Sequence, residues 1–182
     1  VATLIHEMAH KIVFLENDTS FNESFAVFVE KEGLLQFLEQ FKNTDLFEHD
    51  GEKIFQWYLS SRKDRSLFNE LIKNTYFEMK ILFASKVSDK EKLLKKEQLF
   101  EKLRENYLNK KKSFQVLSYD NWFKKKLNNT HLLGVRRYNS EVQKFELLFE
   151  KNGRKWSKFF QAVRDLANLS KKEREKVLES LK

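Results

Sequence analysis

The stretch that organises this chain is Val1–Gly33, VATLIHEMAHKIVFLENDTSFNESFAVFVEKEG. It contains His6, Glu7 and His10 within the segment HEMAH. On a helix, residues four positions apart project from one face, so His6 and His10 lie one turn from each other. At that separation two neutral imidazole nitrogens can share one zinc ion. Glu7 is rotated about 100° from His6, where its carboxylate can take a proton from a water beside the metal.

A catalytic zinc site uses three protein ligands and one open position, so a third ligand must come from another segment. The nearest well-placed candidate is Glu23, in the segment NESFA (22–26) at the start of the next helical stretch. The alternative interpretation is that the two histidines are ordinary core residues on an apolar helix face. The flanks of the HEMAH segment are apolar, as expected for a buried active-site helix.

The order HExxH and then N-E-x-F-A resembles the gluzincin metallopeptidases, in which the Glu of the second motif is the third zinc ligand. Aminopeptidase N has a similar pair of motifs with a longer insert. Here twelve residues, 11–22, separate His10 from Glu23. This spacing, continued by FVEKEG, is more similar to the bacterial putative aminopeptidase family. The resemblance implies that His6, His10 and Glu23 bind zinc and that Glu7 is the general base.

A second block, far along the chain, carries the same resemblance. The segment 113–126 contains YDNWF, and LNNTHLL (127–133) and Tyr138 follow it. The closing FFQAVRDLANLSKKERE (159–175) is similar to the C-terminal helices of the family, so the match covers nearly the whole chain. Two departures stand out: Thr130 occupies a position where the family carries Ala, and a Pro expected after the Tyr is missing.

The second block is also where donors to the reaction are expected. Peptide hydrolysis passes through a tetrahedral oxyanion, which a neutral donor beside the metal stabilises. Tyr138 is the first candidate by similarity and His131 is the second, although Tyr138 could equally be a packed aromatic. Asn128 and Asn129 either hold the site together or contact the substrate. Asn22 is placed in the same class of supporting or substrate-binding residues.

Two further acidic positions leave alternatives open. Glu23 and Glu30 are seven residues apart and share a helix face, so Glu30 is a candidate acceptor for a ligand imidazole. An exposed glutamate is the other interpretation. His49 lies in the break at 43–51 together with three carboxylates, where a second metal cluster is conceivable but a solvated turn is favoured.

Composition favours an all-α fold. The 182 residues are 41% hydrophobic and include eighteen Phe, no Pro and four Gly, which suits long helices joined by short turns. The expected elements are a zincin-like helix at 1–14, a Glu-bearing helix at 21–41 capped by Ser20 or Asn22, and C-terminal helices. Between them, 52–60 is a short helix or an extended piece, and 62–85 with 90–112 form a long helical hairpin. The apolar stripes of that hairpin are Leu67, Leu71, Phe77, Ile81 and Leu82 on its first helix, and Leu93, Leu94, Phe100, Leu103 and Tyr107 on its second.

The formal net charge of +8 raises the question of an anionic partner. The basic residues alternate with glutamates along helical segments, and the only runs are 110–112 and 124–126. Without a recognition motif, nucleic-acid binding is not predicted. The absence of Cys excludes disulfides and a thiolate metal site. No apolar stretch approaches the ~20 residues of a membrane span.

The sequence starts without Met, five residues before the first proposed ligand. We therefore expect residues 1–182 to be the single C-terminal catalytic portion of a longer zinc metallopeptidase acting on peptides. The resemblance points to the bacterial cell envelope. Two other hypotheses stay open: a zinc-binding but inactive chain, and a basic helical interaction module in which HEMAH is incidental.

Overall fold

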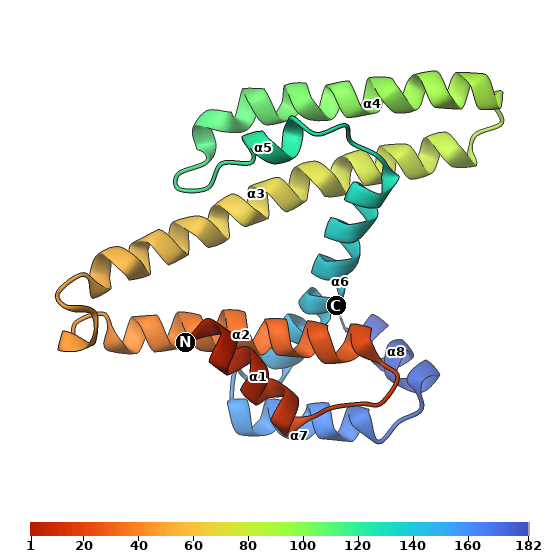
Figure 1. Ribbon diagram of the computed structural model, residues 1–182. Helices are drawn as coiled ribbons and strands as arrows, with labels where there is room; N and C mark the ends of the chain where they lie inside the picture. Colours follow the sequence, from red (N-terminus) through yellow and green to blue (C-terminus); the bar gives the residue numbers. More distant parts are fainter. Residues whose placement is uncertain (182) are drawn as a thin grey trace. The chain divides into compact units, whose positions relative to one another are not determined.

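The computed structural model describes residues 1–181, without the side chains of residues 136–141. No strand occurs within the described residues, which confirms the predicted all-α fold. None of the helices in this range is long and apolar enough to cross a bilayer. The elements (Figure 1) are α1 (Ala2–Ile12), α2 (Thr19–Phe41), the 3₁₀ turn η1 (Asp45–Phe47), α3 (Gly51–Ala84), α4 (Asp89–Lys110), the 3₁₀ turn η2 (Lys111–Ser113), α5 (Asp120–Phe123), α6 (Asn129–Lys151), α7 (Trp156–Ala167) and α8 (Lys171–Glu179).

The chain forms two compact units, of which the first contains residues 1–51 and 138–182. In this unit α2 is the central helix and α1 lies against it (Figure 1). Residues 24–29 of α2 are all buried, so this part of the helix is covered on every side, as its almost continuous apolar sequence requires. Aromatic rings dominate the packing around it. The buried rings are Phe21, Phe25, Phe28, Phe145, Phe149 and Phe159.

The start of α2 differs from the prediction. The N-cap is Asp18, whose side chain accepts a hydrogen bond from the N–H of Phe21, and not Ser20 or Asn22. Asp18 is buried and pairs with Arg174 of α8, with 2.7 Å between Oδ2 and Nη2. The Arg174 guanidinium also lies over the ring of Phe21, 5.0 Å from its centroid. A capping residue that also receives an arginine from far along the chain cannot be recognised from local spacing.

This ion pair gives the first unit a defined response to acid. Burial by itself raises the pKa of Asp18, but hydrogen bonds from Arg174 and from the Phe21 N–H, with the charge of Lys171, outweigh it. The pKa of Asp18 therefore lies below its ordinary value of 3.8. The stability that the ionised carboxylate contributes is present above the ordinary value and is lost as the pH falls through the lower, folded-state pKa.

We expect Asp18→Asn to reduce the free energy of unfolding by about 3–5 kcal/mol at neutral pH, because Arg174 stays buried without its charged partner. Below a pH of 3.8 the difference between the two proteins should shrink, since the native carboxylate becomes protonated as well. Urea denaturation across this pH range measures both effects. A difference that stays constant into strong acid would contradict the assignment.

The second unit contains residues 52–137, and its main feature is the predicted antiparallel helical hairpin, formed by α3 and α4 (Figure 1). Residues 52–60 are not a separate piece but the beginning of α3, which continues to Ala84 without interruption. After the glycine at its first position this helix contains no Gly or Pro, so nothing in its sequence breaks it. Ser88 caps α4 by accepting the N–H of Glu91.

The apolar stripes of the hairpin are only partly as predicted. Phe77, Ile81, Leu93 and Leu94 are exposed, with Ile81 at 72%. Apolar residues spaced three or four positions apart form two neighbouring lines of side chains along α3. The spacing alone does not show which of these lines faces the partner helix. The side chains that form the core of this unit are Phe68, Leu71, Ile72, Met79, Leu82, Phe100, Leu103, Tyr107, Phe123, Leu127 and Leu132.

Asp64, on α3, holds the segment that follows the hairpin. Its buried carboxylate accepts the backbone N–H groups of Gln115, Val116 and Leu117 at 2.8–3.1 Å. Burial raises the pKa of Asp64, but these three backbone donors outweigh it and lower the pKa below its ordinary value. The sequence offers no local signal for this contact, because about fifty residues separate the carboxylate from its donors.

Candidate metal centre

His6 and His10 share one face of α1, as their four-residue spacing predicts. Their ring centroids are 5.0 Å apart, and the planes meet at 81°. Both side chains are mostly buried, with 18% and 17% of their surface exposed. The face that carries them is turned toward α2, because the same helix buries Ala9 and places Ile5 against Gly33 of α2.

Glu23 reaches this pair of imidazoles from the first turns of α2. One carboxylate oxygen lies 3.5 Å from His6 Nε2, and the other lies 3.6 Å from His10 Nε2. The side chain is 52% exposed, so the three groups meet at the edge of the first unit. The possible ligand atoms of His6, His10 and Glu23 all lie within 4.8 Å of one another, and among the described residues these three form the group of His and acidic side chains that does so.

Glu30, two turns further along α2, contacts the other nitrogen of one imidazole. Its Oε2 lies 3.0 Å from His6 Nδ1. In the neutral tautomer that donates from Nδ1–H to this carboxylate, Nε2 carries no proton and faces Glu23, the arrangement that a metal-binding histidine needs. His10 is oriented differently. Its Nδ1 is buried and has no hydrogen-bond partner among the described residues, and its ring contacts those of His6 and Phe14.

These positions fit a small divalent cation. With bonds of about 2.0–2.2 Å to a tetrahedral zinc ion, neighbouring ligand atoms are about 3.3–3.6 Å apart. The two distances from Glu23 to the imidazole nitrogens fall at the upper end of that range. The donor set of two imidazoles and one carboxylate is also a set that zinc uses in catalytic sites. With neutral histidines, Glu23 and Glu30 bring two negative charges to the site, which a dication would neutralise.

The two residues next to the ligands occupy different environments. Glu7 is exposed on α1, beside the ligand face, and is therefore open to water and to a substrate. Asn22, in contrast, is buried, and its carboxamide bonds to the backbone of Leu15 in the loop between α1 and α2. Asn22 thus faces away from solvent, into the loop that joins the two ligand-bearing helices.

The residues predicted from the second block lie around the start of α6. Asn128 accepts the N–H groups of Thr130 and His131, which makes it the N-cap of that helix, a position that Asn favours. Its side chain also lies 2.8 Å from His131 Nδ1. Asn129 is exposed in the first turn of α6. The side chain of Tyr138 falls outside the described residues.

His49 and its acidic neighbours do not form a second cluster within residues 1–181. The segment around them is an exposed turn that includes η1, with Glu48 and His49 in left-handed backbone conformations. The prediction of a solvated turn is therefore confirmed.

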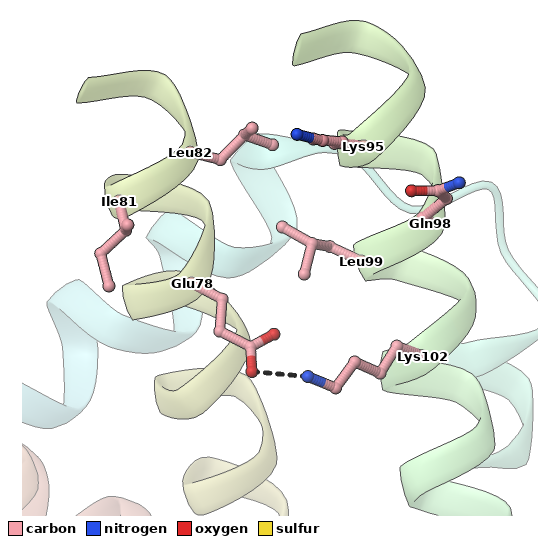
Figure 2. A pocket seen from close by; sticks show the side chains of 7 residues that line it. All are labelled: Glu78, Ile81, Leu82, Lys95, Gln98, Leu99 and Lys102. Carbon is pink, nitrogen blue, oxygen red and sulfur yellow. Dashed lines mark hydrogen bonds and ion pairs between the residues drawn. The ribbon is translucent and has the colours of Figure 1, made fainter. Parts of the chain in front are cut away.

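An open groove of about 500 Å³ lies on the hairpin of the second unit, between α3 and α4. Figure 2 shows Leu82 and Leu99 between the two helices and the ion pair from Glu78 to Lys102, 2.7 Å long, across the groove. None of the predicted site residues lines it, and its lining contains no His, Cys or Asp. The groove therefore adds nothing to the metal centre.

Comparison with protein-family models gives a match. Residues 1–178 match the model of a protein family described as "Putative aminopeptidase". A search of curated proteins and a search of solved structures find no match. The matched range extends over nearly the whole chain and includes His6, His10 and Glu23, the three residues of the candidate metal centre.

Proposed function

The chain belongs to the putative aminopeptidase family, and from this premise we propose that it is a zinc-dependent peptidase whose metal is held by His6, His10 and Glu23. The observation that carries the proposal is the convergence of these three side chains from two helices. Chance explains two histidines on one helix face more easily than it explains a carboxylate placed about equally far from both. The contact between Glu30 and His6 adds support, because ligand imidazoles usually donate their other nitrogen to such a group.

A zinc ion bound at this site would supply a Lewis acid that polarises the scissile carbonyl and lowers the pKa of water. The remaining steps belong to residues of the chain. We assign Glu7 as the general base that takes a proton from the attacking water and passes it to the amine of the leaving product. Its exposure next to the ligand face gives it access to both. Glu30 keeps the His6 ring in one orientation throughout.

The tetrahedral oxyanion that forms during attack needs a hydrogen-bond donor. We retain Tyr138 and His131 as the candidates for this role. Nε2 of His131 would donate in the tautomer whose Nδ1 accepts the backbone N–H of Asn128, a contact of 3.2 Å. The family description also favours substrates with a free amino end, which places the cleaved bond next to that end.

The test is removal of the metal from protein purified without a His tag. We expect one zinc per chain, cleavage of peptides that have a free amino end, loss of cleavage after treatment with EDTA, and recovery after zinc is added. The same peptides with acetylated amino ends should be cleaved slowly or not at all. Zinc binding without cleavage of either set would favour the inactive zinc-binding chain. Protein that purifies without zinc and does not take it up would favour the basic interaction module.

A further inference from the structure

Asn22, which directly precedes the proposed ligand Glu23, makes an unusual contact. Only 2% of it is exposed, and its carboxamide bonds twice to one residue of the preceding loop. The Oδ1 accepts the N–H of Leu15 at 2.9 Å, and the Nδ2 donates to the carbonyl of Leu15 at 2.8 Å. A single side chain thus satisfies both backbone groups of a loop residue, as a neighbouring strand would.

Leu15 lies three residues after the end of α1, so this contact fixes where α1 ends relative to α2. The opposite end of the helix pair is held by close packing. A Cβ atom on Gly33 would lie 3.2 Å from Cγ2 of Ile5, so the first turn of α1 lies almost directly on the α2 backbone. His6 and His10 are located between these two contacts.

The position of Glu23 depends on this pairing more than on packing of its own side chain, which is 52% exposed. Metal ligands must lie within about 0.2 Å of their ideal distances, and a functional site tolerates errors of only about 0.5 Å. A shift of the loop that moved α1 along α2 would therefore separate the two imidazoles from the carboxylate. Asp18, a buried polar residue of the same loop, bonds to the N–H of Phe21 and to Arg174, neither of which belongs to α1.

We propose that Asn22 is a positioning residue for the metal centre: its double hydrogen bond to Leu15 sets the register of α1 against α2, and so brings His6 and His10 onto Glu23. This inference rests on the proposed zinc site. A positioning role differs from a purely structural role. In a purely structural role, loss of Asn22 would lower the stability of the first unit but leave the metal affinity unchanged. The proposal also excludes a direct contact between Asn22 and the substrate, since the side chain is buried.

Two substitutions separate positioning from other effects. Asn22→Ala removes both hydrogen bonds. Asn22→Asp keeps the acceptor for the Leu15 N–H, but sets a second oxygen against the Leu15 carbonyl and adds a negative charge beside Glu23. A charge effect alone would strengthen cation binding in Asn22→Asp, whereas disturbed positioning weakens it. The control is Asn152→Ala, because Asn152 also donates its Nδ2 to a backbone carbonyl of the first unit, that of Leu148 at 2.7 Å.

The experiment measures zinc affinity by competition with a chelating dye, the absorption spectrum of the Co²⁺-loaded protein, and the Tm of the metal-free protein. We expect zinc affinity to fall about 10- to 100-fold in Asn22→Ala and roughly tenfold in Asn22→Asp, with altered Co²⁺ bands in both. Asn152→Ala should lower Tm without changing affinity or spectrum. The proposal is overturned if folded Asn22→Ala and Asn22→Asp proteins bind zinc as tightly as the unmodified protein. If the unmodified protein binds no zinc, the proposed function fails first, and the two failures are therefore distinguishable.

Discussion

Glu7→Gln should leave zinc binding intact and reduce kcat of peptide cleavage by about 10²- to 10⁴-fold, the usual contribution of a general base. The substitution keeps the size of the side chain and removes its ability to accept a proton. Glu7 is exposed on α1 and is not among the three side chains that converge on the proposed ion, so neither folding nor metal content should change. Steady-state kinetics on a peptide with a free amino end, alongside metal analysis of the same sample, measures both quantities.

The control for Glu7 is Glu39→Gln, which makes the same charge change at an exposed position of α2. It should retain full activity. If Glu7→Gln keeps its zinc and cleaves peptides at the unmodified rate, the assignment of Glu7 as the general base is wrong. If both variants lose activity equally, the effect comes from net charge and not from the site.

The second large effect is expected on the affinity of the chain for zinc. His10→Ala removes one of three proposed ligands, and we expect zinc affinity to fall by at least about 100-fold, more than loss of a residue that only orients a ligand. Purified His10→Ala protein should then contain almost no zinc, whereas we expect one ion in the unmodified chain. Glu23→Ala should act in the same direction, because its carboxylate lies 3.5–3.6 Å from both imidazoles.

His49→Ala is the matched control for His10→Ala, because it removes an imidazole from the same unit at an exposed turn outside the converging group. Its zinc content should be unchanged. Equal loss of zinc in the two histidine variants would indicate adventitious binding to surface imidazoles. Unchanged zinc in His10→Ala would remove this residue from the ligand set.

Local features of the fold were predictable from the sequence, and features that depend on distant partners were not. The lack of Pro, the scarcity of Gly and the helical spacing of apolar residues were sufficient to predict an all-α chain with an antiparallel hairpin. They were not sufficient to choose the buried row of α3, because neighbouring rows fit the same period and only the partner helix decides. The cap of α2 was missed for a related reason, since Asp18 is held by Arg174 from the other end of the sequence.

The candidate site shows the same division. Four-residue spacing placed His6 and His10 on one face, and the seven-residue spacing of Glu23 and Glu30 placed two carboxylates on another. That these two faces meet was an inference from resemblance, because spacing within a helix says nothing about its neighbour. Asn22 was grouped with supporting or substrate-binding residues. The partner of its carboxamide, the loop backbone at Leu15, is a contact that only three-dimensional structure reveals.

The most direct test of the zinc site is X-ray absorption at the zinc edge, on tag-free protein loaded with one equivalent of zinc. The account predicts two imidazole nitrogens and carboxylate oxygen at about 2.0–2.2 Å, with one imidazole lost in His10→Ala. A spectrum without imidazole scattering, or one that His10→Ala leaves unchanged, would contradict it.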